Sequence, residues 1–384
     1  MSVSLRTWVL RVAYVLFRSL PVRDRVVLAS THASRLSGSL EAIRAELDRR
    51  GLPVVVLTRP GFGLLGMLVE AIRAEYYLAT SSVFVVDDYF FPLYVVTPKP
   101  GVSVIQTWHA SGAFKKIGYS LLGKSFGASE GLVGRVNIHS NYTHILMGSQ
   151  SSVPAYAEAF HQPAEKFVTN LGIPRTDLFF DEQRMTAARS SIRERYNVPA
   201  DRKVLLYAPT FRGANKFEAS FKDDLDLAEM RRRCGDEYVL LLRLHPLVAA
   251  TPVDPALADF VRDASDHPDI NELLIASDLL VTDYSSVIFE YSLLGRPMVF
   301  FAPDLAEYEA ERGFYFPYRE WVPGPVFTST EPLAAYVAAG EFDSERSVRF
   351  RADSFEVADG HATERFVDEL VLPALGGIRN GAAR

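Results

Sequence analysis

Residues 277–301 read SDLLVTDYSSVIFEYSLLGRPMVFF, and this stretch decides the fold class. Its pattern predicts a strand over 279–281, a polar turn over 282–286 and a helix over 287–294. After a Gly-Arg-Pro break, a second apolar strand follows over 298–301. This order is typical of one parallel β-α-β step, because parallel neighbours need a crossover connection.

The turn that precedes this helix places polar side chains at the carboxyl end of a strand. Ligands of open parallel sheets bind at such ends, and the unpaired N–H groups of a helix start favour a phosphate. Ser and Asp are also ordinary residues for capping a helix, so capping alone explains the same pattern. The sequence therefore leaves a ligand role and a capping role open for four side chains, which are Thr282, Asp283, Ser285 and Ser286.

Length favours two domains, and the composition is ordinary for a soluble globular protein. The 384 residues exceed the usual single-domain size, and 48% of them are hydrophobic. A formal net charge of −6 gives no indication of a nucleic-acid partner. The single cysteine, Cys234, excludes an intrachain disulfide and a cysteine-based zinc site.

Residues 1–21 differ from the rest in being basic and amphipathic. A helical wheel gathers Leu5, Trp8, Val12 and Leu16 on one broad face. Arginines interrupt the apolar run, which excludes a bilayer span and disfavours a secretory signal. We expect this helix to lie on an anionic membrane surface, with ordinary packing on the protein as the alternative.

Apolar strands alternate with helical stretches from residue 26 onward, and the alternation restarts near residue 204. This pattern predicts two doubly wound, Rossmann-like α/β domains in a GT-B-like arrangement, with a cleft between the carboxyl ends of their sheets. The expected parts are a membrane-associating helix, an acceptor-side domain, a donor-binding domain, and a C-terminal helix that crosses back with its tail: 1–21, 22–190, 191–350 and 351–384.

The first candidate catalytic residue is His109, which directly follows a predicted strand over 102–107. A histidine at a strand end is well suited to remove a proton near neutral pH, although a single histidine is more often structural. Neighbouring side chains and an acid after the preceding strand are candidate acceptor or phosphate contacts, namely Trp108, Ser111, Lys115, Lys116 and Asp88. For the lysines, a solvated surface is the alternative. For Asp88, the pattern favours capping of the next segment over a substrate contact.

The second half repeats this arrangement at the ends of two further strands and on the 287–294 helix. Cations, a second imidazole, a hydroxyl and a carboxylate are expected there. The ends of several strands would open on one cleft, and these groups together would suit a phosphorylated or nucleotide ligand. These candidates are Thr210, Arg212, Arg243, His245 and Glu290. No residue spacing indicates a metal site, and no obligatory cofactor is expected.

Several motifs, in this order and spacing, resemble the CDP-glycerol glycerophosphotransferase family, whose members prime or polymerise teichoic acid and related capsule polymers. The resemblance covers roughly residues 79–319. Ala110 stands where many members have glycine, and this difference leaves the identity of the acceptor open. The motifs are ATSSVFVVDDYF, IQTWHASGAFKKIGYS, GIPRTDLF, LLYAPTFR, LLRLHPL and SDLLVTDYSSVIFEYSLLGRPMVFFAPDLAEYEAERGFYF.

The resemblance implies a transferase that uses a CDP-polyol such as CDP-glycerol and a lipid-linked acceptor, releasing CMP at the cytoplasmic face of the membrane. His109 would act as the general base and His245 would stabilise the phosphates or the leaving group. The serines of the 282–286 turn would hold the pyrophosphate, Glu290 the ribose, and Thr210, Arg212 and Arg243 would line the donor pocket. A nucleotide-sugar glycosyltransferase of the same fold and a non-catalytic membrane-associated binding protein are the alternatives.

Overall fold

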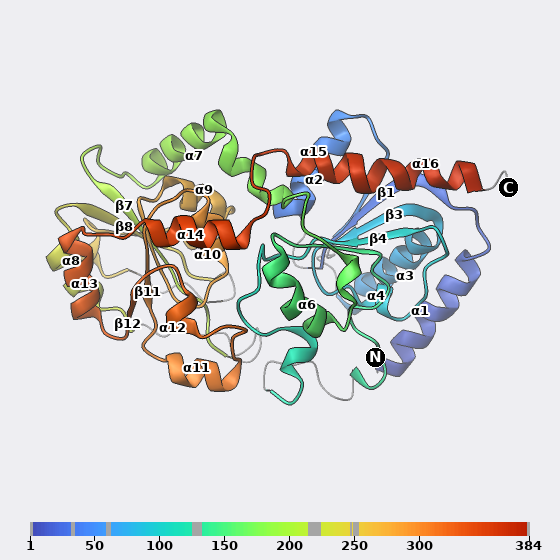
Figure 1. Ribbon diagram of the computed structural model, residues 1–384, viewed down its shortest axis with the longest axis horizontal. Coiled ribbons are helices and arrows are strands. Elements are labelled where there is room, and N and C mark those ends of the chain that lie inside the picture. Colours follow the sequence, from blue (N-terminus) through green and yellow to red (C-terminus); the bar gives the residue numbers. More distant parts are fainter. Residues whose placement is uncertain are drawn as a thin grey trace.

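The computed structural model describes residues 3–31, 35–58, 63–124, 133–213, 224–245, 248 and 253–381. Two six-stranded sheets form the two halves of the molecule, and helices cover both of them (Figure 1). The strand orders are β2-β1-β3-β4-β5-β6 and β12-β11-β10-β7-β8-β9, and the pairs within each sheet are parallel. The predicted α/β class with two Rossmann-like sheets is confirmed.

The strands of the first sheet are β1 (Arg23–Ala29), β2 (Val54–Leu57), β3 (Ser81–Val86), β4 (Ser103–Gln106), β5 (His144–Leu146) and β6 (Phe167–Val168). Those of the second are β7 (Lys203–Ala208), β8 (Tyr238–Leu242), β9 (Val261–Asp263), β10 (Leu279–Thr282), β11 (Met298–Phe301) and β12 (Val326–Phe327). The sequence did not predict β6, β9 and β12, which are edge strands of only two or three residues.

The helices of the first half are α1 (Val3–Phe17), α2 (Gly38–Arg49), α3 (Leu64–Thr80), α4 (Phe91–Tyr94) and α6 (Val153–Phe160). Those that follow are α7 (Glu182–Arg195), α8 (Leu227–Cys234), α9 (Ile270–Ala276), α10 (Val287–Ser292), α11 (Leu305–Glu311), α12 (Tyr318–Trp321), α13 (Thr330–Ala339), α14 (Glu345–Ser354), α15 (Ala362–Phe366) and α16 (Leu372–Gly381). Of the quoted motifs, Pro246 and Leu247 lie outside the described residues.

Alternation of side chains along the strands gives the first sheet two different apolar faces. Val26 and Leu28 of β1 pack in one core with residues of α2 and of the C-terminal helical segment. Val27 and Ala29 face the opposite way and pack with α1 and α3. The sheet is therefore buried on both faces, as its continuous apolar strands predict.

The last helices return to the first half of the molecule. Helix α14 contacts α10 of the second half, whereas α15 contacts α2 and α16 contacts β1 and β3. Figure 1 shows α15 and α16 lying along the first sheet beside α2. Helix α7 contacts α9, so the expected boundary at residue 190 falls inside a helix that packs on the second half.

Helix α1 has two apolar faces, of which only one packs on the protein. Leu10 and Tyr14 are buried against α3. Trp8, Val15 and Leu16 point outward, with 64%, 67% and 67% of their surface exposed. Within the described residues, no helix combines the length and apolar character needed to cross a membrane.

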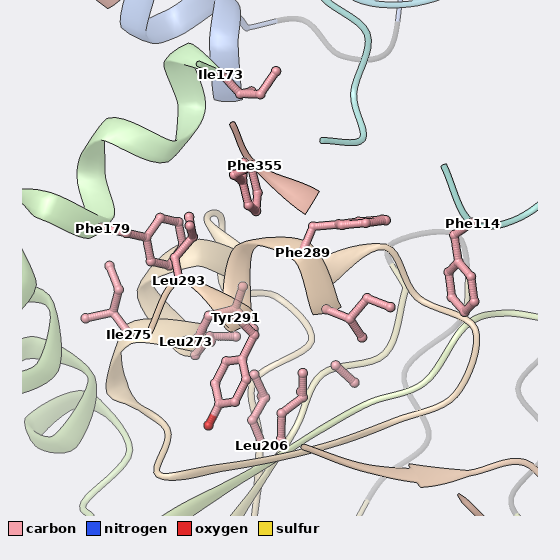
Figure 2. Close-up of a cluster of buried hydrophobic side chains, with 14 of the residues drawn as sticks. Phe114, Ile173, Phe179, Leu206, Leu273, Ile275, Phe289, Tyr291, Leu293 and Phe355 are labelled. Atoms are coloured by element: carbon pink, nitrogen blue, oxygen red, sulfur yellow. The ribbon is translucent and has the colours of Figure 1, made fainter. Parts of the chain in front are cut away.

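The two halves pack through a continuous aromatic core. Phe114 of the first half stacks on Trp321 of the second, with ring centroids 5.0 Å apart, and Lys115 forms an antiparallel β-bridge with Phe314. The ring of Phe289 leaves no room for a side chain at position 112, which explains the glycine there. Figure 2 shows Phe289 on its helix among buried side chains from both halves, including Phe114.

Candidate active site

The turn that follows β4 is held in an unusual conformation by one buried glutamine. Trp108 has a φ of 52°, which is rare for a large side chain and marks local strain. The side-chain oxygen of Gln106 accepts a hydrogen bond from the Trp108 N–H at 2.8 Å. Its amide nitrogen donates to the carbonyl of Asp88 at 3.2 Å and to the Tyr142 hydroxyl at 2.9 Å. Gln106 therefore fixes the loops that follow both β3 and β4.

These two loops bring His109 and Asp88 together. The distance from His109 Nδ1 to Asp88 Oδ1 is 3.7 Å. The imidazole lies against the Trp108 ring, with centroids 4.2 Å apart, and 41% of the His109 side chain is exposed. Because Nδ1 faces a carboxylate, Nε2 is the nitrogen available to a substrate proton, and Asp88 can stabilise the imidazolium that forms.

A buried carboxylate of the second half connects to this turn. Glu290 of α10 accepts a hydrogen bond from the Ser111 hydroxyl at 2.8 Å and lies 3.8 Å from Arg175 Nη1. The same Arg175 nitrogen donates to the carbonyl oxygen of His109 at 2.5 Å. Ser111 and Glu290, both predicted as ligand contacts, are thus bound to each other across the two halves. The ribose role of Glu290 stays a prediction.

The Thr210 loop is joined to the turn after β10 by a buried ion network. Asp283 accepts a hydrogen bond from the Thr210 N–H at 2.8 Å and lies 2.9 Å from Arg212 Nη2. Arg212 also binds Asp304 through Nε at 2.6 Å, and its guanidinium lies over the Tyr284 ring. Arg212 therefore acts as a structural link within the second half. Its predicted contact with the donor stays a prediction.

Four predicted hydroxyls lie in this region in different environments. The Thr282 hydroxyl is fully buried and donates to the carbonyl of Ala208 at 2.7 Å, so it joins two strands. Ser285 Oγ lies 3.5 Å from the Val287 N–H, and Ser286 precedes α10 without a side-chain capping bond. The buried Thr210 hydroxyl has no hydrogen-bond partner within the described part of the chain.

Arg243 and His245, the two predicted residues after β8, lie in different environments. Arg243 donates to the carbonyl oxygens of Leu244 and Ser265, so its guanidinium holds the turn after β9. Burial lowers the pKa of Arg243. His245 is exposed, and its ring lies 4.7 Å from the ring of Phe211, next to Thr210 in the chain. The structure therefore associates His245, and not Arg243, with the Thr210 loop.

Lys115 extends the site between the two halves. Burial and the charges of Arg312 and Arg212 lower the pKa of Lys115 to about 7, although the carboxylate of Asp283 acts in the opposite direction. Lys116 is anchored through its backbone N–H, which donates to the Gly313 carbonyl at 3.1 Å. Lys115 is thus a cation close to Asp283 and Arg212, although the sequence left a solvated role open for it.

Three residues of the site had no predicted role. Gln106 is a polar residue at the end of an apolar strand, which is the signal that could have identified it. Arg175 lies within the quoted motif GIPRTDLF, but its contact with His109 depends on the fold. Asp304 follows β11 and resembles an ordinary helix-capping acid in sequence.

The two facing α/β halves, with a histidine, a carboxylate and cations at their strand ends, have a GT-B-like arrangement. The chain belongs to the CDP-glycerol:poly(glycerophosphate) glycerophosphotransferase family, whose model matches residues 12–372. This match confirms the resemblance seen in the ordered motifs. It also decides between the alternatives raised by the sequence, because the members of this family are enzymes that transfer a polyol phosphate.

Curated relatives agree with this assignment, and a solved structure agrees with the fold. The chain is 40% identical to a teichoic acid ribitol-phosphate primase of Bacillus spizizenii, over 93% of each chain. It is 34% identical to a teichoic acid poly(ribitol-phosphate) polymerase of the same organism, over 96% of this chain and 60% of the relative. A structure of the wall teichoic acid polymerase TagF matches with a TM-score of 0.77 and 23% identity, covering 97% of this chain and 94% of the other.

Replacing Gln106 with Met should impair catalysis more than donor binding. The substitution removes the acceptor for the Trp108 N–H and the donor to Asp88, so the His109–Asp88 pair loses its fixed geometry. We expect kcat to fall by about 10- to 100-fold with the KM for the donor nearly unchanged. The free energy of unfolding should fall by about 1–3 kcal/mol. Steady-state kinetics and urea denaturation measure both effects.

Thr107→Val is the matched control for this variant. Thr107 is the next residue, is equally buried, and its hydroxyl bonds only to the Val86 carbonyl at 3.3 Å among the described contacts. It should lose stability without the loss in kcat. If Gln106→Met and Thr107→Val reduce kcat equally, Gln106 does not position the catalytic pair.

Proposed function

We propose that the enzyme transfers a polyol phosphate from a CDP-activated donor to a hydroxyl of a lipid-linked acceptor in the synthesis of a teichoic acid-like polymer. The observation that carries this proposal is the pairing of His109 with Asp88 at the strand ends that face the second half. Family membership supplies the reaction class. Activity at the cytoplasmic face of the membrane is part of the proposal.

The proposed chemistry begins with the acceptor hydroxyl. His109 Nε2 takes the hydroxyl proton while the oxygen attacks the phosphorus that carries the polyol. The new phosphodiester bond forms as the bond to CMP breaks, and CMP leaves with the electron pair. Such a reaction requires positioning and charge stabilisation above all.

The donor is assigned to the side of the cleft built by the second half. Lys115 and the buried Thr210 hydroxyl are groups that can interact with its phosphates. His245 would stabilise the leaving group, and Ser285 and Ser286 would contact the pyrophosphate near the start of α10. Hydrogen bonding of the ribose to Glu290 is compatible with the bond from Ser111, because a carboxylate accepts several hydrogen bonds.

Ribitol phosphate is the first polyol to test, and glycerol phosphate is the second. The relative that matches this chain over 93% of both lengths is a ribitol-phosphate primase, whereas the family is described by glycerophosphate transfer. The donors CDP-ribitol, CDP-glycerol and UDP-sugars should be compared by the release of CMP or UDP. Release of UDP alone would overturn the proposal, and mass spectrometry of the product on a defined lipid acceptor would count the units added.

Helix α1 supports a peripheral association with the membrane. Its outward face exposes Trp8, Val15 and Leu16, while Arg11 and Arg18 add positive charge on the same helix. An exposed apolar face with flanking basic residues favours binding in the interface of an anionic bilayer. A lipid-linked acceptor would then be presented from the same surface.

Replacing His109 with Ala should abolish transfer and preserve donor binding. Loss of a general base reduces kcat by about 100- to 10,000-fold, whereas His109 is not assigned to the donor. Single-turnover transfer and calorimetric donor binding measure the two effects. His361→Ala is the matched control, because His361 is an exposed histidine at the start of α15, where it lies beside Glu364 and has no assigned role in the site. Unchanged turnover in His109→Ala would remove His109 as the base.

Donor affinity should fall as pH rises through about 7, because Lys115 then loses its proton. A bound diphosphate favours the charged form, so binding at higher pH must take up a proton. We expect affinity to fall about tenfold between about pH 6 and pH 8.5, which corresponds to ~1.4 kcal/mol. Calorimetry in the His109→Ala background avoids a contribution from His109.

Lys115→Met should bind the donor about tenfold more weakly near pH 6 and lose the pH step. Lys203→Met is the control, because Lys203 pairs with Glu237 at the amino end of β7. A pH step that persists in Lys115→Met would assign the titration to another group.

Charging the outward face of α1 should prevent membrane binding without unfolding the enzyme. Trp8→Glu with Leu16→Glu places two carboxylates on side chains that are at least 64% exposed, so the core is untouched. Co-sedimentation with anionic liposomes should fall about tenfold or more. Val348→Glu, at a 55% exposed position of α14, is the control. Equal sedimentation of both variants would exclude α1 as the contact.

A further inference from the structure

A second, apolar cavity lies in the first half of the molecule. Its volume is about 450 Å³, within the range of small-molecule sites. The described walls come from α1, α3, α4 and the strand ends of β1 and β2, and most of them are hydrocarbon or aromatic. The lining includes Arg6, Met67, Ala71, Ala74, Phe91 and Tyr94.

The cavity lies along the same sheet edge as His109. Ser30, at the end of β1, lines the cavity and donates to Asp87, at the end of β3, at 3.0 Å. Tyr89 also lines it, and the Tyr89 ring contacts the Trp108 ring with centroids 5.6 Å apart. Asp88, which pairs with His109, lies between Asp87 and Tyr89 in the chain. The cavity wall is therefore adjacent in sequence to the His109–Asp88 pair.

One cation in this wall, Arg6, has no ionic partner among the residues that the structure describes. The Arg6 guanidinium is half-buried and lies 4.2 Å from the centroid of the Phe91 ring. Throughout the described residues it forms no salt bridge, and burial lowers the pKa of Arg6. Glu70, the acid of the same wall, pairs instead with Arg73 at 3.3 Å. A partly desolvated guanidinium of this kind suits a phosphate group.

The helices that build the cavity also build the outward apolar surface. On α3, Met67 is 42% exposed and Val69 is 55% exposed, and α3 packs directly on α1. The exposed Leu5 and Trp8 flank Arg6 on α1 in sequence. A hydrocarbon chain that enters from a membrane at this surface would therefore meet the cavity with Arg6 in its wall.

We propose that this cavity binds the hydrocarbon chain of the lipid-linked acceptor next to its glycan, with the phosphate of the lipid on Arg6. The inference rests on the proposed function for the identity of the acceptor. An apolar wall, with one cation that forms no salt bridge in the described part of the chain, matches an alkyl or isoprenyl phosphate. A free saccharide or a nucleotide would require more polar partners than this wall offers.

Direct labelling tests the site without requiring transfer activity. The full-length protein on anionic vesicles is irradiated with farnesyl diphosphate that carries a diazirine in its chain, and labelled peptides are identified by mass spectrometry. We expect labels at Ala71, Ala74 and Phe91, and their loss when unlabelled farnesyl diphosphate competes. Labels confined to Trp8, Val15 and Leu16 would mean that the chain meets only the outer membrane-facing surface, which would overturn the proposal.

Two variants test the phosphate and the chain separately. Arg6→Gln removes the cation, and Ala71→Phe fills the cavity. For each, the preference for a long-chain acceptor over a short-chain acceptor with the same glycan, expressed as a ratio of kcat/KM values, should fall about tenfold. Arg44→Gln on α2 and Ala187→Phe on α7 are matched controls at exposed positions.

The two experiments separate failure of this inference from failure of the proposed function. Labelling inside the cavity with no transfer to any acceptor would reject the function and retain a lipid-phosphate site. Transfer with an unchanged chain-length preference in Arg6→Gln and Ala71→Phe would reject the cavity and retain the function. Urea denaturation of Ala71→Phe checks folding, and if that variant is unfolded, Arg6→Gln together with the labelling decides.

Discussion

The structure depends on a buried carboxylate that joins its two halves. Glu290 of the second half binds Ser111 and lies beside Arg175 of the first, and Arg175 in turn holds the backbone at His109. A charge that is almost completely buried needs such partners, since unpaired it would be strongly unfavourable. The requirement to satisfy Glu290 therefore sets how the strand ends of one sheet face those of the other. The aromatic packing of Phe114 on Trp321 reinforces the same arrangement.

The two halves contribute different groups to the candidate site. The first half supplies the His109–Asp88 pair, exposed enough to meet a hydroxyl and held by the Gln106 amide. The second half supplies a network in which Arg212 is already neutralised by Asp283 and Asp304. Much of its positive charge is thus used in structure. Under the proposed function, Lys115, between the halves, therefore has a larger share of the attraction for the anionic donor.

The sequence predicted the elements that depend on local pattern and missed those that depend on tertiary contacts. The apolar runs predicted the principal strands, and their polar ends gave His109 and Asp283 as candidates, whose roles stay predictions. The two-residue strands β6 and β12 are too short for a periodic signal, and the contacts of Glu290 required the orientation of two sheets. For α1, the helical wheel identified the apolar face that stays exposed, while the packed face around Leu10 and Tyr14 is determined by the surface of α3.

The return of α15 and α16 to the first sheet affects the order in which the domains fold during translation. Helix α16 contacts β1 and β3 and α15 contacts α2, and both helices are encoded after the strands of the two sheets. While the ribosome is still synthesising them, the first domain keeps an apolar sheet face open to water, although most of its sequence has already emerged. The second domain, encoded without interruption, can complete its core earlier. Folding of the first domain is therefore completed after that of the second.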